Sequence, residues 1–143
     1  MIDIQEKIVE IAKTKVGIPF HHIGRNDFGY DCAGLFLECL KQVNRYEEDM
    51  DLRAYGRNPE GNKIAKIFNK YFDKIGIEDL KNGDALLFKY VNNPQHIAIF
   101  YELDGKGYMI HAYGDPSVYR VVDHIFDESW RKRFVMGYRL KNQ

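Results

Sequence analysis

The sequence lacks an excess of charge of either sign, and it lacks any long apolar run. Its 143 residues include 21 basic and 21 acidic side chains, so the formal net charge is zero. Nucleic-acid-binding domains usually carry a clear positive charge, and this balance argues against such a partner. No segment approaches the ~20 apolar residues that a membrane-spanning helix needs. We therefore expect neither nucleic-acid binding nor membrane insertion.

The N-terminus lacks the continuous apolar core of a signal peptide. Residues 1–16 place six charged side chains among their apolar positions. A secretory signal requires an uninterrupted apolar stretch of roughly 7–15 residues. We expect the chain to be synthesised in the cytoplasm without a signal peptide.

Cysteine is scarce, and the sequence contains two, Cys32 and Cys39. They lie seven positions apart on one predicted helix, roughly 10 Å along its axis, and so cannot form a disulfide within that helix. Their spacing is also longer than the roughly two to four intervening residues typical of a zinc site. We predict no metal site and no cofactor, and we interpret Cys39 as a small buried apolar residue.

Length and composition are typical of a single folded domain over residues 1–143. The helical spacing of apolar residues predicts helices at residues 4–15, 32–44 and 64–71. The intervening residues 45–62 are interpreted as a loop with a short turn at 50–55. After residue 76, short apolar runs bounded by turn residues predict strands at 85–90, 96–103, 107–113, 118–122 and 136–140. This order predicts an α+β fold, with N-terminal helices packed on a C-terminal antiparallel sheet of about five strands.

Cys32 directly follows Asp31 at the start of the second predicted helix. An aspartate at the N-cap accepts hydrogen bonds from the first turn, and the helix dipole places positive potential where the sulfur lies. This position favours ionisation of the thiol, whereas the charge of Asp31 opposes it. Cys32 is therefore a candidate nucleophile that needs a base nearby.

Two histidines are candidates for that base. The Asp-Gly pair at residues 104–105 predicts a two-residue hairpin turn, which places His111 opposite Ala98 and makes His96 its diagonal neighbour on the same face. A turn one residue longer or shorter would place the two rings on opposite faces. A cysteine, a histidine that takes its proton and a polar residue that orients the histidine suffice for acyl transfer. Cys32, His96 and His111 could fill these roles, or each could be an ordinary packed residue.

Five short motifs follow one another over nearly the whole chain. They are Gly-Ile-Pro-Phe at residues 17–20, Asp-Cys-Ala-Gly-Leu at 31–35, Gly-Asp-Ala-Leu-Leu-Phe at 83–88, His-Ile-Ala-Ile-Phe at 96–100 and Met-Ile-His-Ala at 109–112. In these motifs the chain resembles the NlpC/P60 family of papain-like cell-wall peptidases. The resemblance implies a papain-like fold, with Cys32 as nucleophile, His96 as general base and acid, and His111 as the residue that orients His96. It also implies hydrolysis of amide bonds in peptidoglycan stem peptides, commonly between D-glutamate and the diamino acid.

One position departs from that family, many of whose members carry tyrosine where this chain has Phe20. The resemblance implies that a tyrosine hydroxyl at this position helps to bind the oxyanion or the substrate, and phenylalanine has no such group. The backbone N–H of Cys32 can donate one hydrogen bond to an oxyanion, and His22 is a candidate for the second donor. Arg25 could pair with a substrate carboxylate and Tyr30 could wall the groove, although an exposed arginine and a packed tyrosine are the commoner roles. The full set of oxyanion and substrate-binding candidates is His22, Phe20, Asp31, Tyr30 and Arg25.

Residues 19–25 look most like the family members encoded in phage-tail and gene-transfer-agent clusters. This likeness implies a component of a phage-like particle, with other tail proteins as partners, that reaches the cell wall as part of that particle. Two alternatives stay open: an amidase or acyltransferase that uses the same catalytic residues, and a structural tail protein without catalysis. We expect His21 and His124 to lie at the surface, and Trp130 to anchor the last helical turn by packing.

Overall fold

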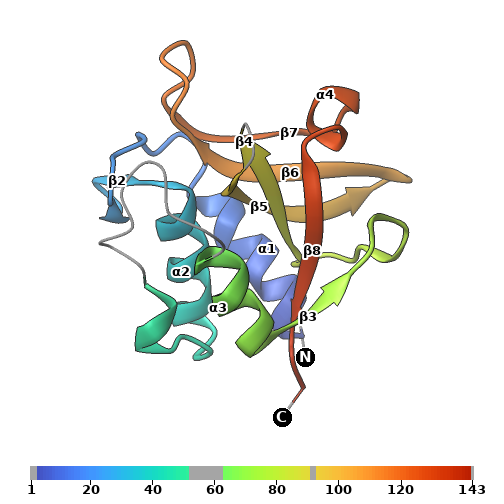
Figure 1. Cartoon of the computed structure of the whole chain (residues 1–143). Coiled ribbons are helices and arrows are strands. Elements are labelled where there is room, and N and C mark those ends of the chain that lie inside the picture. The colour runs from blue at the N-terminus through green and yellow to red at the C-terminus, as the bar shows by residue number, and fades with distance from the viewer. Residues whose placement is uncertain (1–2, 52–62, 91–92, 143) are drawn as a thin grey trace.

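The structure, a computed structural model, describes residues 3–51, 63–90 and 93–142. It confirms the α+β class, with helices packed on a six-stranded antiparallel sheet (Figure 1). None of the helices in these three ranges is long and apolar enough to cross a membrane. In chain order the elements are α1 (Ile4–Thr14), β1 (Arg25–Asn26), β2 (Gly29–Tyr30), α2 (Cys32–Gln42), η1 (Glu48–Met50), α3 (Lys63–Tyr71), β3 (Phe72–Ile75), η3 (Ile77–Asp79), β4 (Ala85–Tyr90), β5 (Asn93–Leu103), β6 (Lys106–Tyr113), β7 (Arg120–Ile125), α4 (Glu128–Arg131) and β8 (Phe134–Leu140).

The three predicted helices are present as α1, α2 and α3, with ends within two residues of the prediction. α1 ends at Thr14, and the chain turns away at Gly17, whose φ is +95°. α2 ends at Gln42 rather than at residue 44. The turn predicted at residues 50–55 lies outside the described residues except at its first two positions.

The sheet has six strands in the order β3-β8-β4-β5-β6-β7. Strands β4 to β7 pair with one another in chain order, and β8 returns to pair with β4. β3 was missed in the sequence because it follows α3 directly, with no turn residue between them to mark a new element. It pairs with β8, from Phe72 opposite Leu140 to Ile75 opposite Gly137.

The hairpin between β5 and β6 has the predicted register. Leu103 pairs with Lys106 at its tip and Ile99 pairs with Ile110 further along. Asp104 and Gly105 both have positive φ, at 52° and 79°, as a two-residue hairpin turn with the twist of a sheet requires. The two-residue turn on which the prediction for His96 and His111 depends is therefore present.

β7 lies further along the chain than predicted, at 120–125 instead of 118–122. A turn delays its start, because the N–H groups of Val118 and Tyr119 both donate to the carbonyl of Asp115. Tyr119 has a φ of +49°, which is incompatible with a strand. The shift brings His124 into the sheet, where it pairs with Met109.

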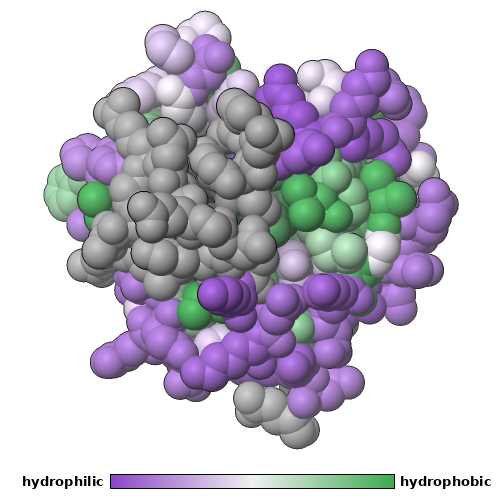
Figure 2. Space-filling view, in the orientation of Figure 1, coloured by the Kyte–Doolittle hydropathy of each residue, from purple (hydrophilic) through white to green (hydrophobic). Residues whose placement is uncertain are grey.

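The sheet separates two hydrophobic cores. In β5, Ile97 and Ile99 face the larger core beneath α1, α2 and α3, whereas Ala98 and Phe100 face a smaller core that includes Trp130 of α4. Figure 1 shows α1, α2 and α3 gathered together, with α4 set apart from them. Figure 2 shows a hydrophobic area at the surface beside β8.

A buried carboxylate ties the start of β4 to the rest of the fold. Asp84 is fully buried and accepts hydrogen bonds from Gln5 of α1, from the backbone N–H of Lys81, and from Nε and Nη2 of Arg139 in β8 at 2.8 and 2.7 Å. We expect Asp84→Ala to lower the free energy of unfolding by about 3 kcal/mol, because it leaves the Arg139 guanidinium without its carboxylate. Urea denaturation measures this change.

The matched control is Glu102→Ala, whose side chain is exposed on β5. This variant should change the free energy of unfolding by less than about 0.5 kcal/mol. An Asp84→Ala variant as stable as the control would show that the hydrogen bonds of Asp84 make no net contribution to the free energy of unfolding.

Candidate active site

Asp31 caps the helix that carries Cys32, as predicted. Its Oδ1 accepts the N–H of Gly34 at 2.6 Å, and its Oδ2 accepts the N–H of Ile23 at 3.2 Å. The first bond satisfies the start of α2, and the second holds the preceding loop against it. Cys32 is therefore the first residue of a well-capped helix, at the positive end of its dipole.

Arg25 reinforces the same helix start. Its Nη1 lies 2.7 Å from Oδ1 of Asp31 and its Nη2 lies 3.0 Å from Oδ1 of Asp51, and all three side chains are nearly buried. A Cβ on Gly34 would lie 2.0 Å from the carbonyl oxygen of Gly24, so glycine is required for the loop to approach α2 this closely. The loop before α2 is thus held rigidly on the helix.

This network changes the interpretation of three predicted binding residues. The guanidinium of Arg25 already pairs with Asp31 and Asp51, so it is not placed to bind a substrate carboxylate. Tyr30 is only 1% exposed and donates its hydroxyl proton to Asp27, so it does not wall a groove. Arg25, Asp31 and Tyr30 support the scaffold of the site.

A gap in the sheet ladder lies where α2 meets β5. The N–H of Phe100 donates to Asp84 on the β4 side, so the alternation along the strand turns the N–H of Ile97 towards β6. The pairing of β5 with β6 begins only at Ile99 and Ile110, beyond this group. The N–H of Ile97 hydrogen-bonds to the sulfur of Cys32 instead. The candidate nucleophile therefore lies against the residue next to His96.

The thiol of Cys32 is held in its uncharged form. Burial, followed by the negative charge of Asp31, raises the pKa of the Cys32 thiol to about 12. The N–H groups of Ile97 and Ala33 act in the opposite direction but do not outweigh burial. Of the two opposing effects expected from the sequence, that of Asp31 prevails together with burial, and a base must take the proton during the reaction.

Three histidine rings form a hydrogen-bonded chain that begins at His96, the residue before Ile97. Nε2 of His96 lies 2.7 Å from Nδ1 of His111, and both side chains are buried. Nε2 of His111 lies 2.8 Å from Nε2 of His124, whose Nδ1 lies 2.8 Å from the carbonyl oxygen of Ile125. The predicted pairing of His96 with His111 is confirmed. The prediction that His124 lies at the surface is wrong, because β7 extends past residue 122 and carries it half-buried into the chain of rings.

Trp130 closes the far side of the histidine chain. Its ring centroid lies 5.5 Å from that of His96, 5.0 Å from that of His111 and 6.2 Å from that of His124. Trp130 is buried in α4, which confirms that it anchors this helix by packing. The same contacts also fix the planes of the three imidazoles.

Burial keeps the inner two rings uncharged. Loss of solvation, assisted by the positive charge of Arg133, lowers the pKa of His96 to about 3. Loss of solvation also holds the pKa of His111 well below 6.5. At neutral pH the resting site consists of a thiol and neutral imidazoles, and His96 is an unprotonated base.

The loop before α2 carries the remaining candidates. Phe20 is half-buried with its ring 5.3 Å from that of Tyr119, so the family's tyrosine hydroxyl has no counterpart in this side chain. His22 is exposed, as is His21, whose Nδ1 bonds the His22 carbonyl, and the role of His22 as an oxyanion donor stays a prediction.

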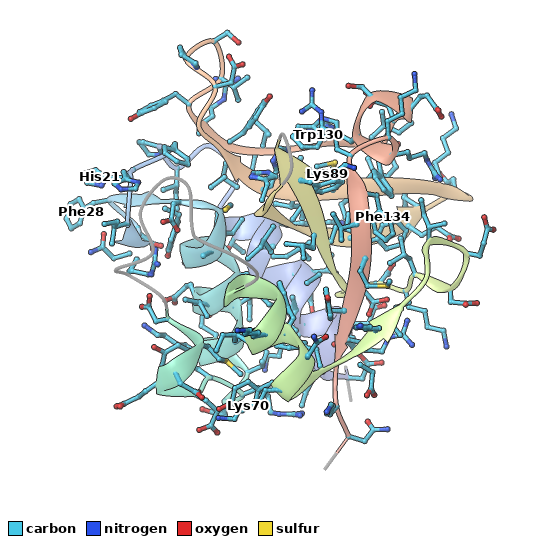
Figure 3. All side chains as sticks on the ribbon, in the orientation of Figure 1. His21, Phe28, Lys70, Lys89, Trp130 and Phe134 are labelled. Carbon is cyan, nitrogen blue, oxygen red and sulfur yellow. The ribbon has the colours of Figure 1, made fainter. Side chains whose placement is uncertain are left out.

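A pocket of about 460 Å³ also lies at this loop. Cys32, His96, His111 and His124 do not line it, and Figure 3 shows His21 and Phe28 at the left edge of the molecule, away from Trp130. It is therefore separate from the histidine chain. Its lining residues are His21, Ile23, Gly24, Arg25, Asn26, Phe28, Gly29 and Lys41.

A cysteine at a helix start, set against histidines on an antiparallel sheet, is the papain-like arrangement. Residues 17–139 match the NlpC/P60 family, and the chain belongs to this family. It is 28% identical over 112 residues to a probable endopeptidase of Mycobacterium bovis, covering 76% of this chain and 24% of the relative. It is 24% identical over 110 residues to the gamma-D-glutamyl-L-lysine dipeptidyl-peptidase of Bacillus subtilis, covering 75% of this chain and 31% of the relative. The chain thus spans 24% and 31% of the length of these two relatives.

Solved structures show the same fold. The NlpC/p60 domain of the peptidoglycan hydrolase SagA is 20% identical with a TM-score of 0.66, covering 95% of this chain and 98% of that one. RipD from Mycobacterium tuberculosis, a non-catalytic NlpC/p60 domain protein adapted to a peptidoglycan-binding function, is 14% identical with a TM-score of 0.58, covering 100% of both chains. The fold is therefore shared by proteins that cleave and by one that does not.

Proposed function

We propose that this chain is a cysteine peptidase that hydrolyses amide bonds in peptidoglycan stem peptides. The observation that carries the proposal is the placement of the Cys32 sulfur on the N–H of Ile97, the residue that follows His96, whose Nε2 lies 2.7 Å from Nδ1 of His111. Membership of the NlpC/P60 family, which includes peptidoglycan hydrolases and endopeptidases, supports the substrate class.

The reaction begins with transfer of the thiol proton. Because Nε2 of His96 is bonded to His111, Nδ1 is the ring nitrogen that accepts the proton of Cys32. The sulfur then attacks the carbonyl carbon of the substrate. The imidazolium of His96 returns the proton to the leaving amine, which departs and leaves a thioester on Cys32. Water, deprotonated by His96, hydrolyses the thioester and restores the thiol.

The start of α2 stabilises the negative charge that develops on the substrate oxygen. We assign the backbone N–H of Cys32, the first residue of the helix, as a donor to this oxyanion. The helix dipole adds positive potential at the same place. The Arg25 and Asp31 network holds this helix end in position before substrate arrives.

The bond that we propose is the one between D-glutamate and the diamino acid of the stem peptide. The name of the Bacillus subtilis relative, a gamma-D-glutamyl-L-lysine dipeptidyl-peptidase, supports this choice. The likeness of residues 19–25 to phage-tail and gene-transfer-agent members supports a further proposal. In this proposal the chain is made in the cytoplasm and acts at the cell wall as part of a phage-like particle. Co-purification of the chain with particle proteins tests this association.

The low pKa of His96 predicts an unusual acid limb in the pH profile. The base works only while it is unprotonated, and burial lowers its pKa from 6.5 to about 3. We expect kcat/KM at pH 5 to remain within about twofold of its value at pH 7. Initial rates on a soluble stem peptide between pH 4 and 8 measure this. A half-fall near pH 6.5 would show that His96 has an ordinary pKa in the working enzyme.

Digestion of soluble muropeptides, followed by mass spectrometry, tests the function. Disaccharide tetrapeptides with either meso-diaminopimelate or L-lysine are the substrates, and Cys32→Ala is the control. Release of the fragment that begins at the diamino acid supports the proposal. Release of the intact stem peptide from muramic acid would indicate an amidase. Binding without any product, in a folded protein, would indicate a non-catalytic member.

A further inference from the structure

The outermost ring of the histidine chain lies outside all five family motifs. His124 is half-buried on β7, bonds His111 through Nε2 at 2.8 Å, and bonds the carbonyl oxygen of Ile125 through Nδ1 at 2.8 Å. The ring of Trp130 packs beside it, and the strand pairing of β7 with β6 fixes its backbone opposite Met109. Both nitrogens of His124 are therefore held against defined partners.

These partners determine where each ring carries its proton. A carbonyl oxygen accepts only, so Nδ1 of His124 must donate to Ile125. While His124 is uncharged, its Nε2 has a lone pair and accepts the proton on Nε2 of His111. The Nδ1 of His111 is then an acceptor, and Nε2 of His96 donates to it. Each ring sets the tautomer of the next, and Nδ1 of His96 ends as the unprotonated nitrogen.

We infer that His124 is a positioning residue that, acting through His111, sets the tautomer in which His96 accepts a proton. The inference rests on the proposed function, because the tautomer matters through the proton transfer from Cys32. The opposite tautomer of His96 would carry a proton on Nδ1 and could not act as the base. The backbone carbonyl of Ile125 is thus the fixed acceptor that determines the direction of every hydrogen bond in the histidine chain.

Histidine nitrogen spectra test the tautomers without any assay of activity. In protein labelled with ¹⁵N-histidine, long-range ¹H–¹⁵N correlations at pH 7.5 distinguish protonated from unprotonated ring nitrogens. We expect the proton on Nδ1 of His124 and on Nε2 of His111 and His96. A proton on Nδ1 of His96 in the wild-type protein would overturn the inference, whether or not the protein cleaves peptidoglycan.

Two substitutions at His124 distinguish a side chain that accepts a hydrogen bond from Nε2 of His111 from one that can only donate to it. His124→Gln keeps a carbonyl oxygen that can accept from Nε2 of His111, whereas His124→Lys offers only donors and forces the reversed tautomers. We expect the glutamine variant to retain kcat within about tenfold. The lysine variant should lose about 10²-fold or more in kcat with little change in KM, as expected for a base held in the wrong tautomer.

The nitrogen spectra of these variants complete the test. The lysine variant should show the proton of His96 moved to Nδ1, and the glutamine variant should show it on Nε2. Equal kcat values for the two folded variants would overturn the inference even if the wild-type enzyme is active. If the wild-type protein cleaves nothing, the proposed function fails, and the spectra still decide whether His124 sets the tautomers.

Discussion

Cys32→Ala is expected to lose at least about 10³-fold in kcat on a soluble stem peptide. The substitution removes the atom that forms the thioester, and alanine offers no nucleophile in its place. The capping of α2 by Asp31 does not involve the Cys32 side chain, so the free energy of unfolding should change little. Initial rates and urea denaturation of the same preparation measure both quantities.

Cys39 provides the matched control for this experiment. It is the second cysteine of the same helix, but it is fully buried in the larger core. Cys39→Ala should retain kcat within a few fold while losing about 1 kcal/mol of stability from the small cavity. Equal loss of activity in the two variants would indicate that the helix, and not the thiol of Cys32, accounts for the effect.

His96→Gln is expected to cause a second large loss, again about 10³-fold or more in kcat. Glutamine can still bond Nδ1 of His111, but it has no nitrogen that accepts a proton near neutral pH. Because the nucleophile and its base act as a unit, the double variant with Cys32→Ala should be no slower than Cys32→Ala alone. Rates of the two single variants and the double variant measure this non-additivity.

His21→Gln is the control for His96, since His21 is an exposed histidine on the loop before α2. Its kcat should stay within about twofold of the wild-type value. A His96→Gln variant with activity close to that of His21→Gln would remove His96 from the mechanism. Circular dichroism in the near ultraviolet confirms that the packing around Trp130 survives in both variants.

The elements that define the site follow from local sequence signals. Asp31 before an apolar helical run predicts both the cap and the position of Cys32, and the structure confirms the capping bond. The Asp-Gly pair at residues 104–105 fixes the register of β5 and β6, which decides whether His96 and His111 meet. Each of these features depends on a few neighbouring residues, and such features can be predicted from one sequence.

The features that were missed depend on contacts between distant segments. The turn at Asp115 moves the start of β7 and so brings His124 to His111, which the apolar pattern of residues 118–122 does not reveal. The burial that raises the pKa of the Cys32 thiol likewise requires β5 to pack against α2. His124 and Val122 lie two positions apart and therefore share one face of β7. This spacing could have placed His124 near His111, but only if the strand had been given its correct start and end.

The pairing of Arg25 with two carboxylates is also a tertiary result. Asp51 lies 26 positions along the chain from Arg25, and nothing in the local pattern links them. An arginine next to a candidate site therefore suggested substrate binding, whereas the structure uses it to hold the loop on α2. Charged residues near a catalytic motif are poorly assigned until their partners are known.

The most direct test of the central claim is covalent labelling of the nucleophile. A stem-peptide analogue that carries a chloromethyl ketone in place of the scissile amide is incubated with the wild-type protein, and the adduct is mapped by mass spectrometry while residual activity is measured. We predict one adduct per chain, on Cys32, with loss of muropeptide cleavage in proportion to labelling and no adduct on Cys39. A protein fully labelled at Cys32 that still cleaves muropeptides would contradict this prediction.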